Sequence, residues 1–120
     1  MTNPQPARDA VSAVLPWLDG ADQPPRPALA LAVRTSLKLL AGIAPGRSVE
    51  VRVPPFAAIQ CVEGPRHTRG TPPNVIETDP RTWLELATGR LTWPDAVATG
   101  RVTASGNRAD LSTQLPLLRF

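Results

Sequence analysis

The sequence contains few of the residues that catalytic and metal sites require. Its 120 residues include one cysteine, Cys61, and one histidine, His67, so a single chain cannot form an internal disulfide or a His-rich metal site. Catalysis by a thiol needs a positioned base, and Cys61 stands in an apolar stretch, where a thiol normally packs as an inert side chain. A phosphate-binding loop is also missing, because no Lys-Ser pair follows the segment 64–70. We therefore expect neither enzyme activity nor a metal or other cofactor.

The chain also lacks tyrosine, long apolar runs and a strong charge. Aromatic residues make up 4% of the sequence, which leaves little platform for stacking bases, so a weak nucleic-acid binder ranks third among the functions considered. The net charge of +3 is scattered along the chain, as is typical of a solvated surface. No apolar run approaches the roughly 18 residues of a membrane span, and residues 1–9 lack the features of a signal peptide. We expect a cytoplasmic protein. A transient contact with a membrane or with another protein remains compatible with the sequence.

The length suits one domain, with a tail and helix over residues 1–26 before the main part at 27–120. Residues 1–6 are expected to form a loose tail. A helical apolar stripe follows over residues 11–18, and Pro16 should kink or stop that helix near Leu15. A second helix should open at Pro27 and end near Ala44, because Pro45 and a glycine follow.

Four segments have the pattern of strands. Residues 48–53 alternate apolar and polar side chains, which predicts a half-buried strand. Residues 56–62 are apolar on both faces, which favours a central strand covered on each side, or a strand with one face toward a cavity. Residues 74–78 and 102–105 are predicted to be short strands.

Cap signals place three helices in the second half. Asp79 is a predicted N-cap for a helix that ends at Gly89, and Thr92 caps a short helix that ends at Gly100. A last helix should begin near Asn107 and carry an apolar edge of leucines. The fold class is therefore α+β, with a curved, mostly antiparallel mixed sheet of about four to five strands covered by helices.

Residues 83–118 resemble the closing segment of sterol carrier domains. The matching pattern is Trp-x-x-Leu-Ala-Thr-Gly over residues 83–89, then Asp-Ala at 95–96, Gly-Arg-Val at 100–102, Ser-Gly at 105–106 and a Leu-rich end. The likeness extends over roughly residues 28–118 and favours the small, stand-alone bacterial branch of the type found in actinobacteria. It implies an apolar tunnel between sheet and helices that binds sterols, acyl chains or other lipids without chemistry.

The candidate lining residues come from the resemblance and from the pattern. The resemblance implies that the tunnel is lined by Trp83, Leu86, Leu91, Val97, Leu111, Leu115 and Leu118. The doubly apolar strand adds Phe56 and Ala58, and Trp93 is expected over the mouth of a groove. The loop residues Arg66, His67 and Arg69 could contact an anionic head group, or form a solvated surface turn.

Two functions therefore fit the sequence best. The first is non-catalytic binding of a lipid or other apolar ligand in an internal tunnel. The alternative is a protein-interaction module on the same fold with a filled core, which docks through Trp17 or through residues 66–69. A cavity beneath the sheet distinguishes the two.

Overall fold

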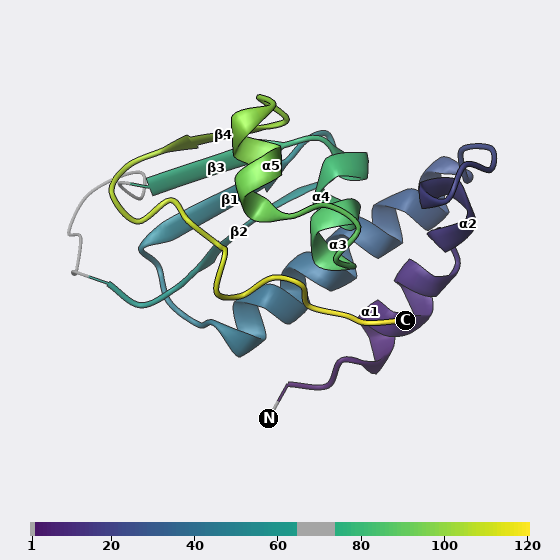
Figure 1. The fold of residues 1–120 in the computed structure, drawn as a ribbon. Coiled ribbons are helices and arrows are strands. Elements are labelled where there is room, and N and C mark those ends of the chain that lie inside the picture. The colour runs from purple at the N-terminus through teal and green to yellow at the C-terminus, as the bar shows by residue number, and fades with distance from the viewer. Residues whose placement is uncertain (1, 65–73) are drawn as a thin grey trace.

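The computed structural model describes residues 2–64 and 74–120, which form an α+β fold (Figure 1). The elements in chain order are α1 (Gln5–Ser12), α2 (Leu15–Leu18), α3 (Arg26–Ile43), β1 (Val49–Val53), β2 (Ala57–Cys61), β3 (Asn74–Thr78), α4 (Pro80–Ala87), α5 (Trp93–Ala98) and β4 (Val102–Ser105). The four-stranded sheet has the order β2-β1-β3-β4. The β1–β3 pair is parallel and the other two pairs are antiparallel, so the predicted fold class is confirmed.

One face of the sheet is buried against the helices. Val51 pairs with Ile59 on β2 and with Ile76 on β3, so these three side chains share a face. Val51 and Ile76 are fully buried, and α3 packs beside β2. On the other face, Arg52 stands between exposed Ala58 and exposed Glu77. The alternation predicted for β1 is therefore confirmed, with a single covered face.

Trp83 joins α4 to α3 at the centre of the core. The side chain is 1% exposed, and its indole Nε1 donates to Ser36 Oγ at 2.8 Å. The Ser36 hydroxyl in turn donates to the carbonyl of Ala32 at 2.6 Å. Both polar groups are therefore satisfied inside an apolar cluster, which removes the penalty that an unpaired buried donor would carry.

The helix ends follow the cap signals in the sequence. The Asp79 carboxylate accepts the backbone N–H of Thr82 at 3.0 Å, and Thr92 Oγ1 accepts that of Asp95 at 3.3 Å. Gly89 and Gly100 have φ of 79° and 74°, the left-handed conformation in which glycine commonly terminates a helix. The predicted starts and stops of α4 and α5 are confirmed.

The predicted last helix is wrong. Residues 106–120 contain a turn and extended chain instead of a helix. The Asp110 carboxylate accepts the backbone N–H of Ser112 at 2.7 Å, which favours a local turn, and Pro116 disfavours helical geometry at Leu115. Beyond it the chain binds α4, because the backbone N–H groups of Leu117 and Leu118 both donate to the Ala87 carbonyl.

The predicted central position of the second strand is also wrong. β2 is an edge strand, and Ala58 and Gln60 are exposed on its open face. Alanine and glutamine side chains tolerate exposure to solvent, so a strand that carries them does not need a second packed layer on that face. Phe56 is half-buried beside the turn that precedes β2, with the Arg26 guanidinium 5.1 Å from its ring centroid.

The N-terminal region differs from prediction in its boundaries. α1 begins at Gln5, inside the expected tail, and ends at Ser12, before the predicted stop. Pro16 lies in the first turn of the separate helix α2, where its missing N–H is tolerated. The apolar stripe nevertheless continues across the break, because Val14 and Leu18 are both buried.

Candidate functional site

A pocket is lined by residues of α4, of α5 and of the C-terminal segment. Figure 1 shows this segment in yellow, running from β4 to the C-terminus. We call this pocket the C-terminal pocket, and its volume is about 250 Å³. Its wall consists of Leu86, Gly89, Leu91, Thr92, Trp93, Pro94, Ser112, Leu115, Pro116 and Arg119.

Close contact between the α4 terminus and the C-terminal segment shapes this pocket. A Cβ atom on Gly89 would lie 3.5 Å from the Pro116 ring, so the backbone of the turn packs directly beneath that proline. The backbone N–H of Leu91 donates to the Glu85 carbonyl at 3.2 Å, which folds the chain back toward α5. The Thr92 cap then sets the start of α5, so that Trp93 forms one side of the wall.

The wall is suited to binding an apolar group. Leucine, proline and tryptophan side chains supply most of it, and Trp93 is 8% exposed. Its polar members are two hydroxyl side chains and Arg119. Within the described residues, the wall contains no carboxylate, thiol or imidazole, which are the groups that act as acids, bases and strong nucleophiles.

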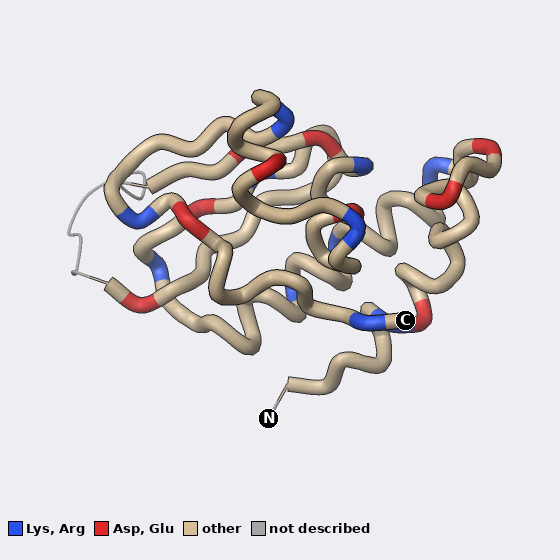
Figure 2. Tube along the Cα trace, in the orientation of Figure 1, with Lys and Arg blue, Asp and Glu red and all other residues tan. Residues whose placement is uncertain are grey.

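Ion pairs among the described residues lie both within elements and between them. Basic and acidic residues are interspersed along the chain (Figure 2). Glu85 on α4 pairs with Arg81 and with Arg101, which precedes β4. Arg90 donates to Asp19 at 2.8 Å, and this hydrogen bond holds the pKa of the Asp19 carboxyl below its usual value.

The predicted lining residues lie in four different places. Four of them line the C-terminal pocket: Leu86, Leu91, Trp93 and Leu115. Trp83, Leu111 and Leu118 are buried in the core, whereas Val97 on α5 is 44% exposed. Phe56 and Ala58 line a separate open hollow of about 360 Å³ beside the β1–β2 turn.

The predicted head-group residues Arg66, His67 and Arg69 lie outside the described residues. Ser112, Pro116 and Arg119 are pocket residues that the sequence patterns did not predict. The available signal was Gly89, which ends α4 in the left-handed conformation and so turns the chain away from the helix axis.

Cys61 has the environment expected of an inert thiol. It is fully buried on β2, and burial raises the pKa of its thiol to about 11. Among residues 2–64 and 74–120, no group of three or more His, Cys, Asp or Glu side chains is arranged to hold a metal ion.

The comparisons with known proteins agree with the fold. A family model described as "Bacterial SCP ortholog" matches residues 25–117. No curated protein matches the chain. Within the described residues, none of the helices has the length and apolar character needed to cross a membrane. Because the matched region runs from the start of α3 into the C-terminal segment, the chain belongs to the family of bacterial SCP orthologs.

Proposed function

We propose that this protein binds the apolar part of a lipid or a similar ligand in the C-terminal pocket, without chemistry. Family membership supports a sterol-carrier-like role. The observation that carries the proposal is the meeting of four sequence-chosen residues, Leu86, Leu91, Trp93 and Leu115, around one hollow. The proposed location is the cytoplasm, where the single thiol of the chain stays reduced.

The pocket volume limits what can enter. The pocket measures about 250 Å³, and a water molecule occupies about 30 Å³ of liquid, so a group the size of about eight waters fills it. This volume lies just below the roughly 300–1,000 Å³ of typical ligand sites. We therefore infer that a short chain, or one end of a larger lipid, enters the pocket. Each buried methylene would contribute about 0.8 kcal/mol.

Arg119 supports a preference for an amphipathic ligand. This residue belongs to a mostly apolar wall, so a carboxylate or phosphate attached to an apolar chain could pair with its guanidinium.

The test uses two substitutions of the same kind. Leu91→Gln places an amide in the pocket wall, whereas Val97→Gln places one on the exposed side of α5. Binding of a fluorescent fatty acid is expected to weaken about tenfold in Leu91→Gln, because roughly two methylenes' worth of burial is lost, and to stay unchanged in Val97→Gln. Native mass spectrometry of protein from its own host gives a second readout. Absence of both a co-purifying apolar molecule and fatty-acid uptake would refute the proposal.

A protein-interaction module is the second candidate, favoured by the packed interior. The space between the sheet and α3 contains fully buried side chains, including Leu37, Leu40 and Trp83. Cross-linking in host lysate distinguishes the candidates. A partner recovered with wild type and lost when Trp17 is replaced by Ala, together with no lipid uptake, would favour interaction over carriage.

A further inference from the structure

A third hollow, larger than the two described above, lies between the N-terminal tail and α3. We call it the N-terminal groove, and its volume is about 590 Å³, inside the roughly 300–1,000 Å³ range of ligand sites. Its wall consists of Thr2, Asn3, Pro6, Ala7, Thr35, Lys38, Leu39, Ala41 and Gly42. Residues 2–7 precede the region 25–117 that matches the family, so one wall of the groove comes from outside the matched domain.

Gly42 explains how the tail reaches α3. Gly42 is the penultimate residue of α3. A Cβ atom at position 42 would lie 2.5 Å from Thr2 Oγ1 and 2.6 Å from its Cγ2, which is closer than real Cβ atoms approach. The bare glycine therefore lets the Thr2 side chain lie directly on the last turn of α3, and both residues belong to the groove wall.

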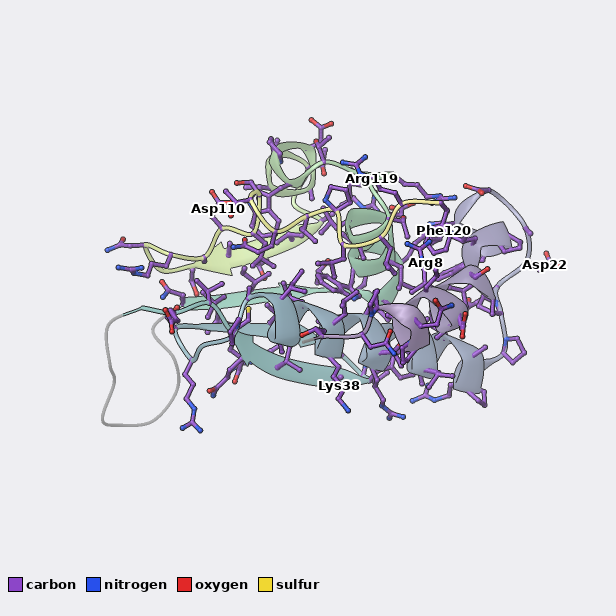
Figure 3. All side chains as sticks on the ribbon, turned by 90° about the horizontal axis from the view of Figure 1, so that it is seen from below. Arg8, Asp22, Lys38, Asp110, Arg119 and Phe120 are labelled. Atoms are coloured by element: carbon purple, nitrogen blue, oxygen red, sulfur yellow. The ribbon has the colours of Figure 1, made fainter. Side chains whose placement is uncertain are left out.

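The chemistry of the wall selects an amphipathic anion. Proline, alanine and leucine supply apolar surface, and among the described residues of the wall Lys38 is the only one with a charged side chain. Among the described residues, no carboxylate forms an ion pair with Lys38. Its side chain extends outward from α3 (Figure 3), so its ammonium can meet a head group at the rim while an apolar chain lies inside.

We propose that the N-terminal groove binds a single-chain amphiphile with an anionic head, with the chain between the tail and α3 and the head beside Lys38. Arg34 stands one turn away on α3, donates to the Phe56 carbonyl at 3.3 Å and does not line the groove. This site is independent of the C-terminal pocket and of the function proposed for it.

Amide chemical shifts measured during a titration with decanoate test the proposal on the whole chain. We expect shifts at residues 3–7 and 35–42. Decyltrimethylammonium has the same chain and the opposite head charge, and it should bind more weakly. Equal binding of the two probes, or shifts confined to residues 86–93 and 112–119, would contradict the groove.

Two variants separate the head contact from the chain contact. Lys38→Gln should weaken decanoate binding about two- to fivefold at low salt, because exposed ion pairs have modest energies, and this difference should shrink in high salt. Arg34→Gln removes the same charge outside the wall and is the matched control. Gly42→Ala should keep α3 helical by circular dichroism but force the Thr2 side chain to move, so that decanoate binding falls. Equal effects of the two charge variants, or undiminished binding in Gly42→Ala, would overturn the assignment.

Vesicles of phosphatidylglycerol distinguish a free amphiphile from a membrane surface as the source of the anion. Decanoate binding without sedimentation on vesicles indicates a free ligand, and sedimentation that Lys38→Gln and Gly42→Ala both reduce indicates a membrane lipid held in the groove. Sedimentation unaffected by either variant, without decanoate binding, would contradict the proposal. Leu91→Gln should alter only the C-terminal pocket, so failure of one site is distinguishable from failure of the other.

Discussion

Leu118 provides the most direct test of how the C-terminal segment contributes to the fold. The segment has neither helix nor strand, yet the Leu118 side chain is 1% exposed. Its backbone N–H also donates to the Ala87 carbonyl at 3.0 Å. We therefore expect the Leu118→Ala variant to behave as a core deletion, although the residue lies in irregular chain near the terminus.

The expected loss follows from the burial of this side chain. Leucine-to-alanine changes in packed cores lower the free energy of unfolding by about 2–5 kcal/mol, and a middle value of about 3 kcal/mol is appropriate here. A chain of 120 residues has a total stability of roughly 6–18 kcal/mol. The variant should therefore remain folded in water but lose a substantial part of its free energy of unfolding.

Urea unfolding followed by tryptophan fluorescence measures the change. With a slope of about 2 kcal/mol per molar urea, a loss of about 3 kcal/mol lowers the midpoint by about 1.5 M. The matched control is Leu31→Ala, because Leu31 is 55% exposed on α3 and its loss should stay within about 0.5 kcal/mol. A loss below about 1 kcal/mol in Leu118→Ala, at unchanged slope, would refute the docking of the segment.

Three further predictions follow from individual polar groups. Asp79→Ala should lower the free energy of unfolding by about 1 kcal/mol. Burial alone would raise the pKa of Asp79, but hydrogen bonds from Thr82 outweigh it and hold the pKa below the ordinary value. The difference in unfolding free energy between wild type and variant should therefore be full above about pH 4. It should shrink as the pH falls through the folded-state pKa. A difference that is constant down to pH 2 would contradict this. Ser36→Ala should lower the free energy of unfolding by about 1–3 kcal/mol, because the indole of Trp83 loses its buried partner, whereas Thr35→Ala on the same helix should have a smaller effect in the same urea assay. Burial raises the pKa of the Cys61 thiol to about 11, so roughly one thiol in a thousand is ionised at pH 8. Cys61 should therefore react with a thiol reagent at pH 8 only after unfolding. Fast reaction of the native protein would disprove its burial.

Local signals in the sequence were sufficient to place most helices and strands. The N-cap at Asp79, the cap at Thr92 and the glycines after α4 and α5 act within three or four residues of their own position, so no distant contact is needed to specify them. The alternation of residues 49–53 likewise specifies which side of β1 is buried.

Local sequence patterns did not predict the structure where contacts between segments far apart in the chain determine it. The leucines near the C-terminus are spaced as in a helix, but the segment gains more from hydrogen bonds to the Ala87 carbonyl and from burying Leu118 than from a short helix interrupted by Pro116. The apolar character of β2 was visible in the sequence. Its position at the edge of the sheet depends on the order in which the strands pair, which the sequence of β2 does not specify.

The candidate sites show the same division. The sequence offered the apolar residues Leu86, Leu91, Trp93 and Leu115, and their meeting around one pocket required the turn at Gly89 and the crossing of the C-terminal segment. The N-terminal groove had no local signal, because it arises only when the tail lies on Gly42.

The sequence by itself therefore determined the caps, the periodic faces, the α+β class and the membership of a sterol-carrier-like family. Tertiary structure decided the edge position of β2, the irregular path of the C-terminal segment, the C-terminal pocket and the N-terminal groove. The physical reason is range: capping and periodicity depend on neighbours within a few residues, whereas strand order and pockets depend on which distant surfaces exclude water from one another.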